Sequence, residues 1–314
     1  KISFRRSMRE MKKAIVIGMI AAMTAGMTAC GNSSSDSAPA TTAPAATENT
    51  QQEKTADATA ADTAASDLSG TVVITGSTSV EKILNDMKDE FTAQNPNVTI
   101  EYTGSGSSAG IKDTKAKTNN IGASSREIKD DEKDADLKQE VFAYDGIAVI
   151  VNPANEAVKN ITTEQLADIY SGKITNWKEV GGDDAEIFVV SREESSGTRS
   201  AFEELIALED AGGLTGAASV SEGNGPVQAA VAENANAIGY VSFSFIDDTV
   251  KALTVNDVEP TAELAKTGEY PLSRPFIFVY YDDTVTDAGK AFLDFALTED
   301  GQACVDNHGG IRVK

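Results

Sequence analysis

The chain has 314 residues, of which 40% are hydrophobic and 24% are charged. This composition is typical of globular proteins, and the length suits about two domains. Acidic residues outnumber basic residues by 49 to 27, and the net charge of -22 argues against nucleic acid or anionic lipid as a partner. Two cysteines are too few for a disulfide framework, and one histidine with scattered acids indicates neither a metal site nor a cofactor.

The N-terminal segment has the pattern of a secretion signal. Lys12 and Lys13 precede an apolar run, 14–29, that is too short to cross a membrane comfortably. The run leads into "MTAC" at Cys30, which resembles a bacterial lipoprotein signal, although Met27 stands where that motif usually has leucine. The resemblance implies a signal peptide at 1–29, cleavage before Cys30, and acylation of the Cys30 thiol by a fatty acid such as palmitate. The alternative is a plain secretory signal with an incidental cysteine.

The next segment has a different composition. Residues 31–67 are rich in alanine, threonine, serine, proline and aspartate, with almost no large apolar side chain. Such a segment cannot bury enough apolar surface to fold. We therefore expect residues 30–70 to be an acylated cysteine followed by a disordered tether.

From Thr71 onward, the chain alternates between predicted strands and predicted helices. A β-branched run at 71–77 predicts the first strand, and apolar residues at helical spacing from Val80 to Phe91 predict a helix that Pro96 ends. The later elements are a strand, turn and helix start in "VTIEYTGSGSSAGIK", a linking strand pair in "VFAYDGIAVIVN", a helix at 163–170, a strand at 187–190, a helix after Thr198, strands in "AIGYVSFSF" and "PFIFVYY", and closing helices from 292. This alternation predicts an α/β fold with two mostly parallel sheets flanked by helices.

Three predicted strand-to-helix turns share one chemistry: "TGSTSVE" (75–81), "TGSGSSAG" (103–110) and "REESSGTRS" (192–200). Each turn puts glycine and small hydroxyl residues at a helix N-terminus, where backbone N–H groups are unpaired and the helix dipole is positive. In open α/β sheets, ligands collect at the carboxyl ends of strands, where these turns lie. The three turns therefore predict an anion-binding site.

Each turn taken alone also fits ordinary helix capping. Thr78 with Glu81, and Ser200 with Glu203, have the spacing of a capping box. Three such turns in one chain, one of them with Arg192 beside it, favour a shared oxyanion over three separate caps. A chain this acidic needs a local site of this kind, because its overall field repels anions.

An enzyme is a second interpretation. The stretch "GSSAG" (106–110) fits the nucleophile elbow of a serine hydrolase with Ser108 at its centre, and His308 follows it in the chain order that such enzymes require. However, His308 has no clear orienting acid, and a hydrolase leaves "SREESSGTR" unexplained. The hydrolase is therefore the weaker interpretation.

The motifs, taken in order, resemble a known family. They are "GSTSV", "YTGSGSSAGIK", "IGASSREI", "DGIAVIVN", "LADIYSGKITNWKEVGG", "SREESSGTRSAF", "GNGPVQAAVAENANAIGYVSFSF" and "YPLSRPFIFVY". This set resembles the phosphate-binding lipoproteins (PstS family) of bacterial high-affinity phosphate ABC transporters, in their Gram-positive form, from about Thr71 to Arg312.

The resemblance implies a two-lobed periplasmic-binding-protein fold of type II that closes over its ligand. Lobe one would comprise residues 71–146 with 273–314, and lobe two residues 147–272, with hinges at Gly146 and at 270–275. It also implies a monomeric extracytoplasmic receptor, lipid-anchored to the cell membrane, that binds inorganic phosphate between its lobes. Such a receptor delivers phosphate to ABC transporter permease subunits and is not an enzyme. The alternatives are a receptor for another tetrahedral oxyanion such as sulfate or molybdate, a serine hydrolase that uses Ser108, and an adhesion or signalling lipoprotein.

Carried over residue by residue, the resemblance also assigns the phosphate contacts. Arg192 would supply a charged clamp, because its planar fork suits an oxyanion, and Glu194 would hold this arginine in place. The remaining contacts would be hydroxyl and amide donors at the three turns, from Thr78, Ser79, Val80, Ser107, Ser196, Gly197 and Thr198.

One position departs from the family pattern. Some members have an aspartate in the "IGAS" segment that accepts the proton of phosphate, whereas this chain has Ser125 there, followed by Arg126. We expect Ser125 to contact the ligand and to discriminate less sharply, because a hydroxyl can either accept or donate a hydrogen bond. We still expect phosphate to be preferred over sulfate. Arg126 is equally compatible with a role near the ligand and with a surface position paired with Glu127 or Asp130.

Overall fold

The computed structural model describes residues 68–313 of the chain. The predicted signal peptide, the acylation of Cys30 and all but the last three residues of the predicted tether lie outside the described residues. Within 68–313, no helix is long and apolar enough to span a bilayer.

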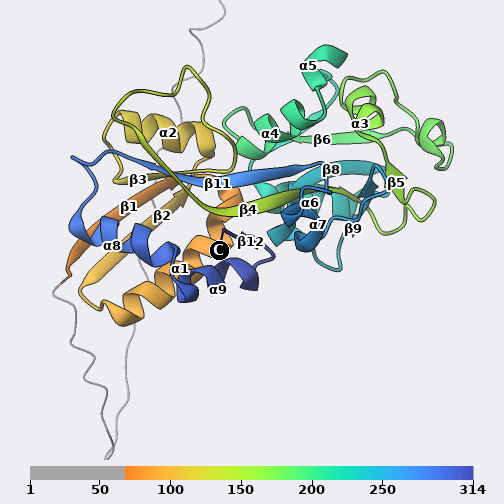
Figure 1. Cartoon of the computed structure of the whole chain (residues 1–314). Helices are drawn as coiled ribbons and strands as arrows, with labels where there is room; N and C mark the ends of the chain where they lie inside the picture. Colours follow the sequence, from red (N-terminus) through yellow and green to blue (C-terminus); the bar gives the residue numbers. More distant parts are fainter. Residues whose placement is uncertain (1–67, 314) are drawn as a thin grey trace, which may run out of the picture. The chain divides into compact units, whose positions relative to one another are not determined.

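Strands and helices alternate along this part of the chain, as the sequence predicts (Figure 1). The strands are β1 (Gly70–Gly76), β2 (Val98–Gly104), β3 (Ile121–Ser124), β4 (Lys138–Val151), β5 (Asn160–Ile161), β6 (Phe188–Arg192), β7 (Ser219–Ser221), β8 (Ala237–Ser242), β9 (Lys251–Ala252), β10 (Thr254–Val255), β11 (Ser273–Tyr280) and β12 (Ile311–Arg312). The helices are α1 (Glu81–Gln94), α2 (Ser107–Lys115), α3 (Thr163–Tyr170), α4 (Gly197–Leu205), α5 (Leu208–Ala211), α6 (Asn224–Glu233), α7 (Ala262–Lys266), α8 (Asp287–Ala296) and α9 (Glu299–Asn307), with 3-10 turns η1 (Thr78–Val80), η2 (Trp177–Val180) and η3 (Phe243–Phe245).

The pairing of the strands explains the mixed character of the sheet. In the described residues, a ten-stranded sheet has the order β2-β1-β3-β11-β4-β8-β6-β7, with β9 and β12 also paired to β4. The pairs that β1 makes with β2 and β3, and that β6 makes with β7 and β8, are parallel, as alternation with helices predicts. The pairs that involve β4 or β11 are antiparallel.

Strand β4 corrects one prediction. The sequence predicts two strands in "VFAYDGIAVIVN", but the structure forms a single strand of 14 residues. Asp145 and Gly146 do not make a turn, because they pair in register with Arg274 and Ser273 of β11. Gly146 is required for another reason, since a Cβ there would overlap the ring of Phe243. β4 and β11 therefore run side by side between two groups of helices (Figure 1). Their pairing joins the strands on either side of them into one sheet.

Two large hydrophobic cores lie along this sheet. The first core contains buried residues between Val72 and Ala143 and between Phe276 and Val305. The second core contains buried residues between Ile147 and Leu272, together with Ile311. Cys304 is a free thiol buried in the first core, where it acts as a small apolar side chain.

The topology brings the polar turns of the first core to one edge of the sheet. β1 lies between β2 and β3 in parallel register, so that Gly76 pairs with Gly104 on one side and with Ala123 on the other. The carbonyl oxygen of Gly76 accepts the amides of Ser105 and Gly106, each at 2.8 Å. The residues that follow all three strands therefore meet at the carboxyl edge, where ligands bind in open α/β sheets.

Candidate anion-binding site

The first turn, after β1, is capped by a residue that the sequence interpretation overlooks. Ser77 is the N-cap of η1, and its Oγ accepts the amide of Ser79 at 3.2 Å. The expected capping box of Thr78 with Glu81 is wrong, because α1 begins at Glu81 after Val80, which makes no side-chain cap. The Thr78 hydroxyl is thereby left for other partners. The amide of Val80, expected as a ligand donor, instead donates to the Ser77 carbonyl at 3.3 Å.

The second turn places Ser107 at the start of α2. Gly106 is the N-cap with φ 93°, and a Cβ there would come within 2.7 Å of the Ser195 carbonyl oxygen. Only glycine allows this backbone conformation and this close approach at low cost. Ser107 is fully buried, and its Oγ accepts the amide of Ser125 at 3.0 Å.

The third turn begins α4 and belongs to the second core. Ser196 is the N-cap, and its Oγ accepts the amide of Arg199 at 3.1 Å. The expected capping box of Ser200 with Glu203 is wrong, because the helix starts at Gly197 and Ser200 already lies inside it. Thr198, in the first turn of this helix, is buried with its hydroxyl 2.7 Å from Ser79 Oγ. The turns of the two cores thus meet directly.

Arg192 is the charged centre of this meeting point. Its side chain is 1% exposed, and Nη2 donates to Thr78 Oγ1 at 3.0 Å. Nε and Nη2 donate to the two carboxylate oxygens of Glu193, each at 2.8 Å. Nη1 is buried and has no hydrogen-bond partner among the described residues. A buried guanidinium nitrogen without a partner is costly, and an anionic ligand would satisfy it.

The carboxylate that holds Arg192 is not the one expected. Glu194 is exposed, whereas the adjacent Glu193 is partly buried against the guanidinium. Burial raises the pKa of Glu193, but hydrogen bonds from Arg192 and its positive charge outweigh this effect, so the pKa lies below its ordinary value. Glu193 also accepts the amide of Gly223 at 3.2 Å, which fixes it from a second side. The expectation for Glu194 is therefore wrong by one residue.

Ser125 lies where the sequence predicts, but its surroundings limit what it can do. It is fully buried, and its Oγ accepts the Ser77 hydroxyl at 2.8 Å and Arg274 Nη1 at 3.3 Å. A hydroxyl has two accepting lone pairs, and these two donors occupy both. In this arrangement both accepting positions of the Ser125 hydroxyl are occupied by donors from the chain itself.

Arg126 is not a surface residue. It is 3% exposed, and its two terminal nitrogens each donate to a different oxygen of Glu132 at 2.7 Å. Nη2 also donates to Ser108 Oγ at 2.9 Å, and Nη1 to the Glu127 carbonyl oxygen at 2.8 Å. The partners expected from the sequence, the side chains of Glu127 and Asp130, are wrong. Through the bond to Ser108, the Arg126–Glu132 pair contacts the first turn of α2.

Three further residues enter the site without having been assigned from the sequence. Arg274 of β11 donates through Nη2 to Ser79 Oγ at 3.0 Å. Asp145 of β4 accepts from Arg274 Nε at 3.1 Å and from Nη2 at 2.8 Å. The side-chain amide nitrogen of Asn224, at the start of α6, donates to the hydroxyls of Thr78 and Ser79 at 3.2 Å each. The sequence feature that could have identified Asp145 and Arg274 is a charged residue inside an apolar strand, as in "FAYDGIAV" and "SRPFIFV".

The pair of Arg274 and Asp145 is among the most buried ion pairs of the described residues. The two side chains are 2% and 1% exposed. Burial raises the pKa of Asp145 and lowers that of Arg274, and their mutual attraction opposes both changes. The positive charge of Arg192 adds to the lowering of the Arg274 pKa. Two buried guanidinium groups that repel each other are both stabilised by an anion bound between them.

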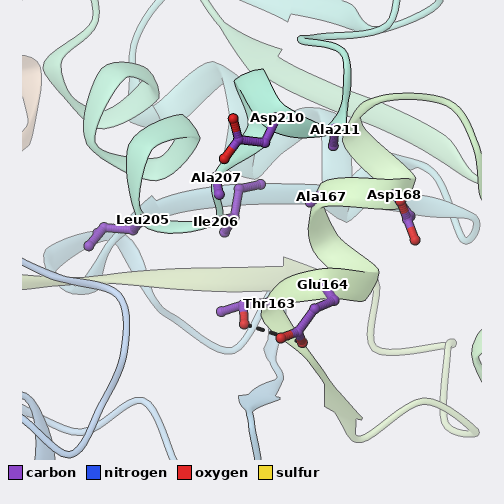
Figure 2. A pocket seen from close by; sticks show the side chains of 9 residues that line it. All are labelled: Thr163, Glu164, Ala167, Asp168, Leu205, Ile206, Ala207, Asp210 and Ala211. Carbon is purple, nitrogen blue, oxygen red and sulfur yellow. Dashed lines mark hydrogen bonds between the residues drawn. The ribbon is translucent and has the colours of Figure 1, made fainter.

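A surface pocket elsewhere in the structure has the wrong chemistry for an anion. It has a volume of about 360 Å³ and lies between α3 and the junction of α4 with α5 (Figure 2). Its polar lining includes the carboxylates of Glu164, Asp168 and Asp210 and no basic side chain. Acidic groups repel an anion, so this pocket does not suit an oxyanion.

Comparisons with known proteins now bear on this geometry. The chain matches the family model described as a PBP superfamily domain over residues 38–300. The phosphate-binding protein PstS of Bacillus subtilis is 35% identical over 244 residues, which cover 76% of this chain and 78% of that protein. The chain belongs to the PstS family.

Solved structures agree with this assignment. A structure from Clostridium perfringens, described as that of a phosphate ABC transporter substrate-binding protein with bound phosphate, is 46% identical with a TM-score of 0.76, and the match covers 78% of this chain and all of that one. An ABC-type phosphate transport receptor from Vibrio cholerae is 36% identical with a TM-score of 0.66, over 76% of this chain and 99% of that one. The periplasmic-binding-protein fold expected from the sequence is confirmed.

Family membership also decides between receptor and enzyme. The relatives are binding proteins and transport receptors, so the chain is a receptor and not an enzyme. The geometry agrees, because Ser108 and His308 have different partners. The Ser108 hydroxyl accepts a hydrogen bond from Arg126, whereas His308 Nε2 lies 3.4 Å from Asp86 Oδ2. No contact between Ser108 and His308 occurs among the described residues, and a serine nucleophile needs its histidine within hydrogen-bond reach.

Proposed function

We propose that this chain is a lipid-anchored extracytoplasmic receptor that binds inorganic phosphate and delivers it to the permease subunits of an ABC transporter. The observation that carries the proposal is Arg192 Nη1, a buried cationic donor that lacks a partner among the described residues. It lies in a cluster of hydroxyl groups and helix N-termini, which are groups that can donate hydrogen bonds to an anion. The Clostridium perfringens structure, with its bound phosphate, supports phosphate as the oxyanion.

The ligand contacts follow from this placement. Arg192 donates to one phosphate oxygen through its free Nη1, and the N-termini of α2 and α4 place their positive dipole ends beside the same anion. The proposed contact set is Thr78, Ser79, Val80, Ser107, Ser125, Arg192, Ser196, Gly197 and Thr198. Val80 belongs to this set by its position in η1, although its backbone amide already donates to the Ser77 carbonyl oxygen.

The site suggests a division into two lobes that close on the ligand. We assign residues 71–146 with 273–314 to lobe one and residues 147–272 to lobe two. Each core falls within one of these ranges, except for Ile311. Contacts such as that of Ser79 with Thr198 would then join the lobes in the closed state. Bending near Gly146 and 270–275, where β4 and β11 pair, would open the site.

The anchor is the second part of the proposal. Acylation of Cys30 would hold a monomeric receptor at the outer face of the cell membrane, and residues 31–70 would form the tether. Replacing Cys30 by serine should release the protein into the medium with its phosphate affinity unchanged. Retention of this variant on the membrane would contradict lipidation at Cys30.

Calorimetry tests the receptor function. The purified chain should bind phosphate, and we expect weaker heats with sulfate and molybdate. Arg192→Ala should cost at least about 2 kcal/mol of phosphate binding free energy, because it removes a charge-assisted donor from a buried site. Unchanged phosphate binding in Arg192→Ala would remove the proposed site, and the absence of phosphate binding by the unaltered chain would remove the proposed function.

A further inference from the structure

The first residues of α6 contact both halves of the anion site. The backbone amide of Gly223, the N-cap of this helix, donates to Glu193 Oε2 at 3.2 Å, and Glu193 in turn holds Arg192. Asn224, the next residue, reaches the hydroxyl groups of η1 instead. The stretch "GNGPVQ", which contributes nothing to the proposed contact set, therefore lies where the arginine and the hydroxyl groups of the site are both held.

The side chain of Asn224 has a fixed orientation. It is 1% exposed, and its Oδ1 accepts the backbone amide of Ser242 at 3.1 Å, so its nitrogen must face the site. Nδ2 donates to Thr78 Oγ1 and to Ser79 Oγ at 3.2 Å each. A side-chain amide has two N–H groups, and these two acceptors use both. Asn224 therefore has no donor left for an anion and can act on it only through the two hydroxyl groups.

These two hydrogen bonds cross from one core to the other. Val80 of η1 packs in the first core, whereas Val227 of α6 packs in the second. The bonds from Asn224 to η1 can therefore form only where the two cores meet. If the cores separate, the Asn224 amide loses both acceptors, and a buried amide without partners is costly unless water replaces them.

We propose that Asn224 is a positioning residue of the anion site, which holds the hydroxyl groups of Thr78 and Ser79 once the two lobes have closed and so slows the release of the bound anion. Thr78 Oγ1 also accepts from Arg192 Nη2 at 3.0 Å, and a hydroxyl that accepts twice keeps its own proton to donate to the anion. This inference rests on the proposed function, because it concerns how the same site retains phosphate.

The other end of α6 provides a matched control for Asn224→Ala. Asn152 makes the same number of side-chain hydrogen bonds. Its Nδ2 donates to the carbonyl oxygens of Val231 and Ala232 at 3.1 and 2.7 Å, and its Oδ1 accepts the amide of Ala154 at 2.9 Å. All of these partners lie within the range 147–272, so Asn152 stabilises α6 without joining the two cores. Asn152→Ala therefore removes an equivalent set of bonds that does not depend on closure.

Stopped-flow measurement of phosphate binding separates the two roles. In Asn224→Ala, the dissociation rate constant should rise at least about tenfold, because the lost bonds hold the closed site together. The association rate constant should change less than about threefold, because these bonds form only after phosphate has entered the open site. Asn152→Ala should lower the Tm of the unliganded chain but leave both rate constants within about twofold of the unaltered chain.

A second measurement shows whether Asn224 acts through the hydroxyl groups. Thr78→Val keeps the shape of the side chain but removes one of the two acceptors of Asn224 Nδ2. In a Thr78→Val background, the loss of phosphate affinity caused by Asn224→Ala should be at least about threefold smaller than in the unaltered chain, because residues that act as a unit are not additive. Calorimetry of the four proteins completes this double-mutant cycle.

Equal changes of the dissociation rate constant in Asn224→Ala and Asn152→Ala would show that Asn224 only stabilises α6 and would overturn the inference. Additive losses in the cycle with Thr78→Val would overturn it as well. If Asn224→Ala does not fold, Asn224→Ser gives the same readouts, because its hydroxyl can accept the Ser242 amide but is too short to reach both hydroxyl groups of η1. Failure of the unaltered chain to bind phosphate would instead contradict the proposed function, so the two failures are distinguishable.

Discussion

Gly197 lies against Ser107 with no space for a side chain. A Cβ on Gly197 would come within 2.7 Å of both Ser107 Cβ and Ser125 Oγ, and closer still to Ser107 Oγ. Gly197 begins α4 and Ser107 begins α2, so this contact brings together two helix N-termini from different cores. The absence of a side chain at Gly197 therefore allows the two positive helix ends to approach each other closely.

Gly197→Ala should accordingly weaken phosphate binding at least about tenfold, because the added methyl group forces the two helix ends apart. Calorimetry with phosphate measures this loss. Gly216→Ala is the control, because a Cβ at Gly216 meets nothing within 4 Å, and it should bind phosphate normally. Normal affinity in Gly197→Ala would mean that these helix ends do not approach each other in the bound state.

The neighbouring glutamates 193 and 194 provide a matched pair of variants. Glu193→Gln should weaken phosphate binding about tenfold or more, because it removes the carboxylate that orients Arg192 through two hydrogen bonds. Glu194→Gln should have no effect, since Glu194 is exposed. The two dissociation constants check this expectation. A larger loss in Glu194→Gln would restore the assignment made from the sequence.

Ser108 distinguishes a receptor from a hydrolase at a single atom. Ser108→Ala should change phosphate affinity no more than a few-fold, because the Ser108 hydroxyl accepts from Arg126 and touches none of the proposed contacts. The unaltered chain should also fail to hydrolyse simple esters. Ester hydrolysis that disappears in Ser108→Ala would contradict the assignment as a receptor.

Glu132 should make the stability of the chain depend on pH in the acid range. Burial raises its pKa, but the hydrogen bonds from Arg126 and from the Lys129 amide outweigh this, so the pKa lies below its ordinary value. A lowered pKa contributes stability above the unfolded value of about 4.3, and this contribution is lost as the pH falls through the folded value.

Glu132→Gln should therefore lower the Tm at neutral pH, and the difference from the unaltered chain should shrink as the pH falls below about 4.3. Thermal unfolding between about pH 7 and about pH 3 measures it. Glu194→Gln, at an exposed position, should show no such convergence. A difference in Tm that stays constant with pH would mean that Glu132 acts through packing and not through its charge.

The sequence by itself determined the parts of this site that depend on neighbouring residues. A Ser/Gly-rich turn between an apolar strand and an amphipathic helix places donors at a helix N-terminus wherever the rest of the chain goes, so the turns around Ser107 and Ser196 could be predicted. The helix at Thr163–Tyr170 could be predicted for the same reason, since its periodicity and its cap at Thr162 are local.

Only the tertiary structure decided which side chains complete the site. Arg274 and Asp145 are 129 residues apart, and they pair because β4 and β11 lie in antiparallel register at those positions. Even the choice between Glu193 and Glu194 needed the fold, because both residues lie in the turn after β6 and only Glu193 meets the Arg192 guanidinium. Hydroxyl groups present donors or acceptors according to the partners that surround them in space, and those partners come from strands and helices far apart in the sequence.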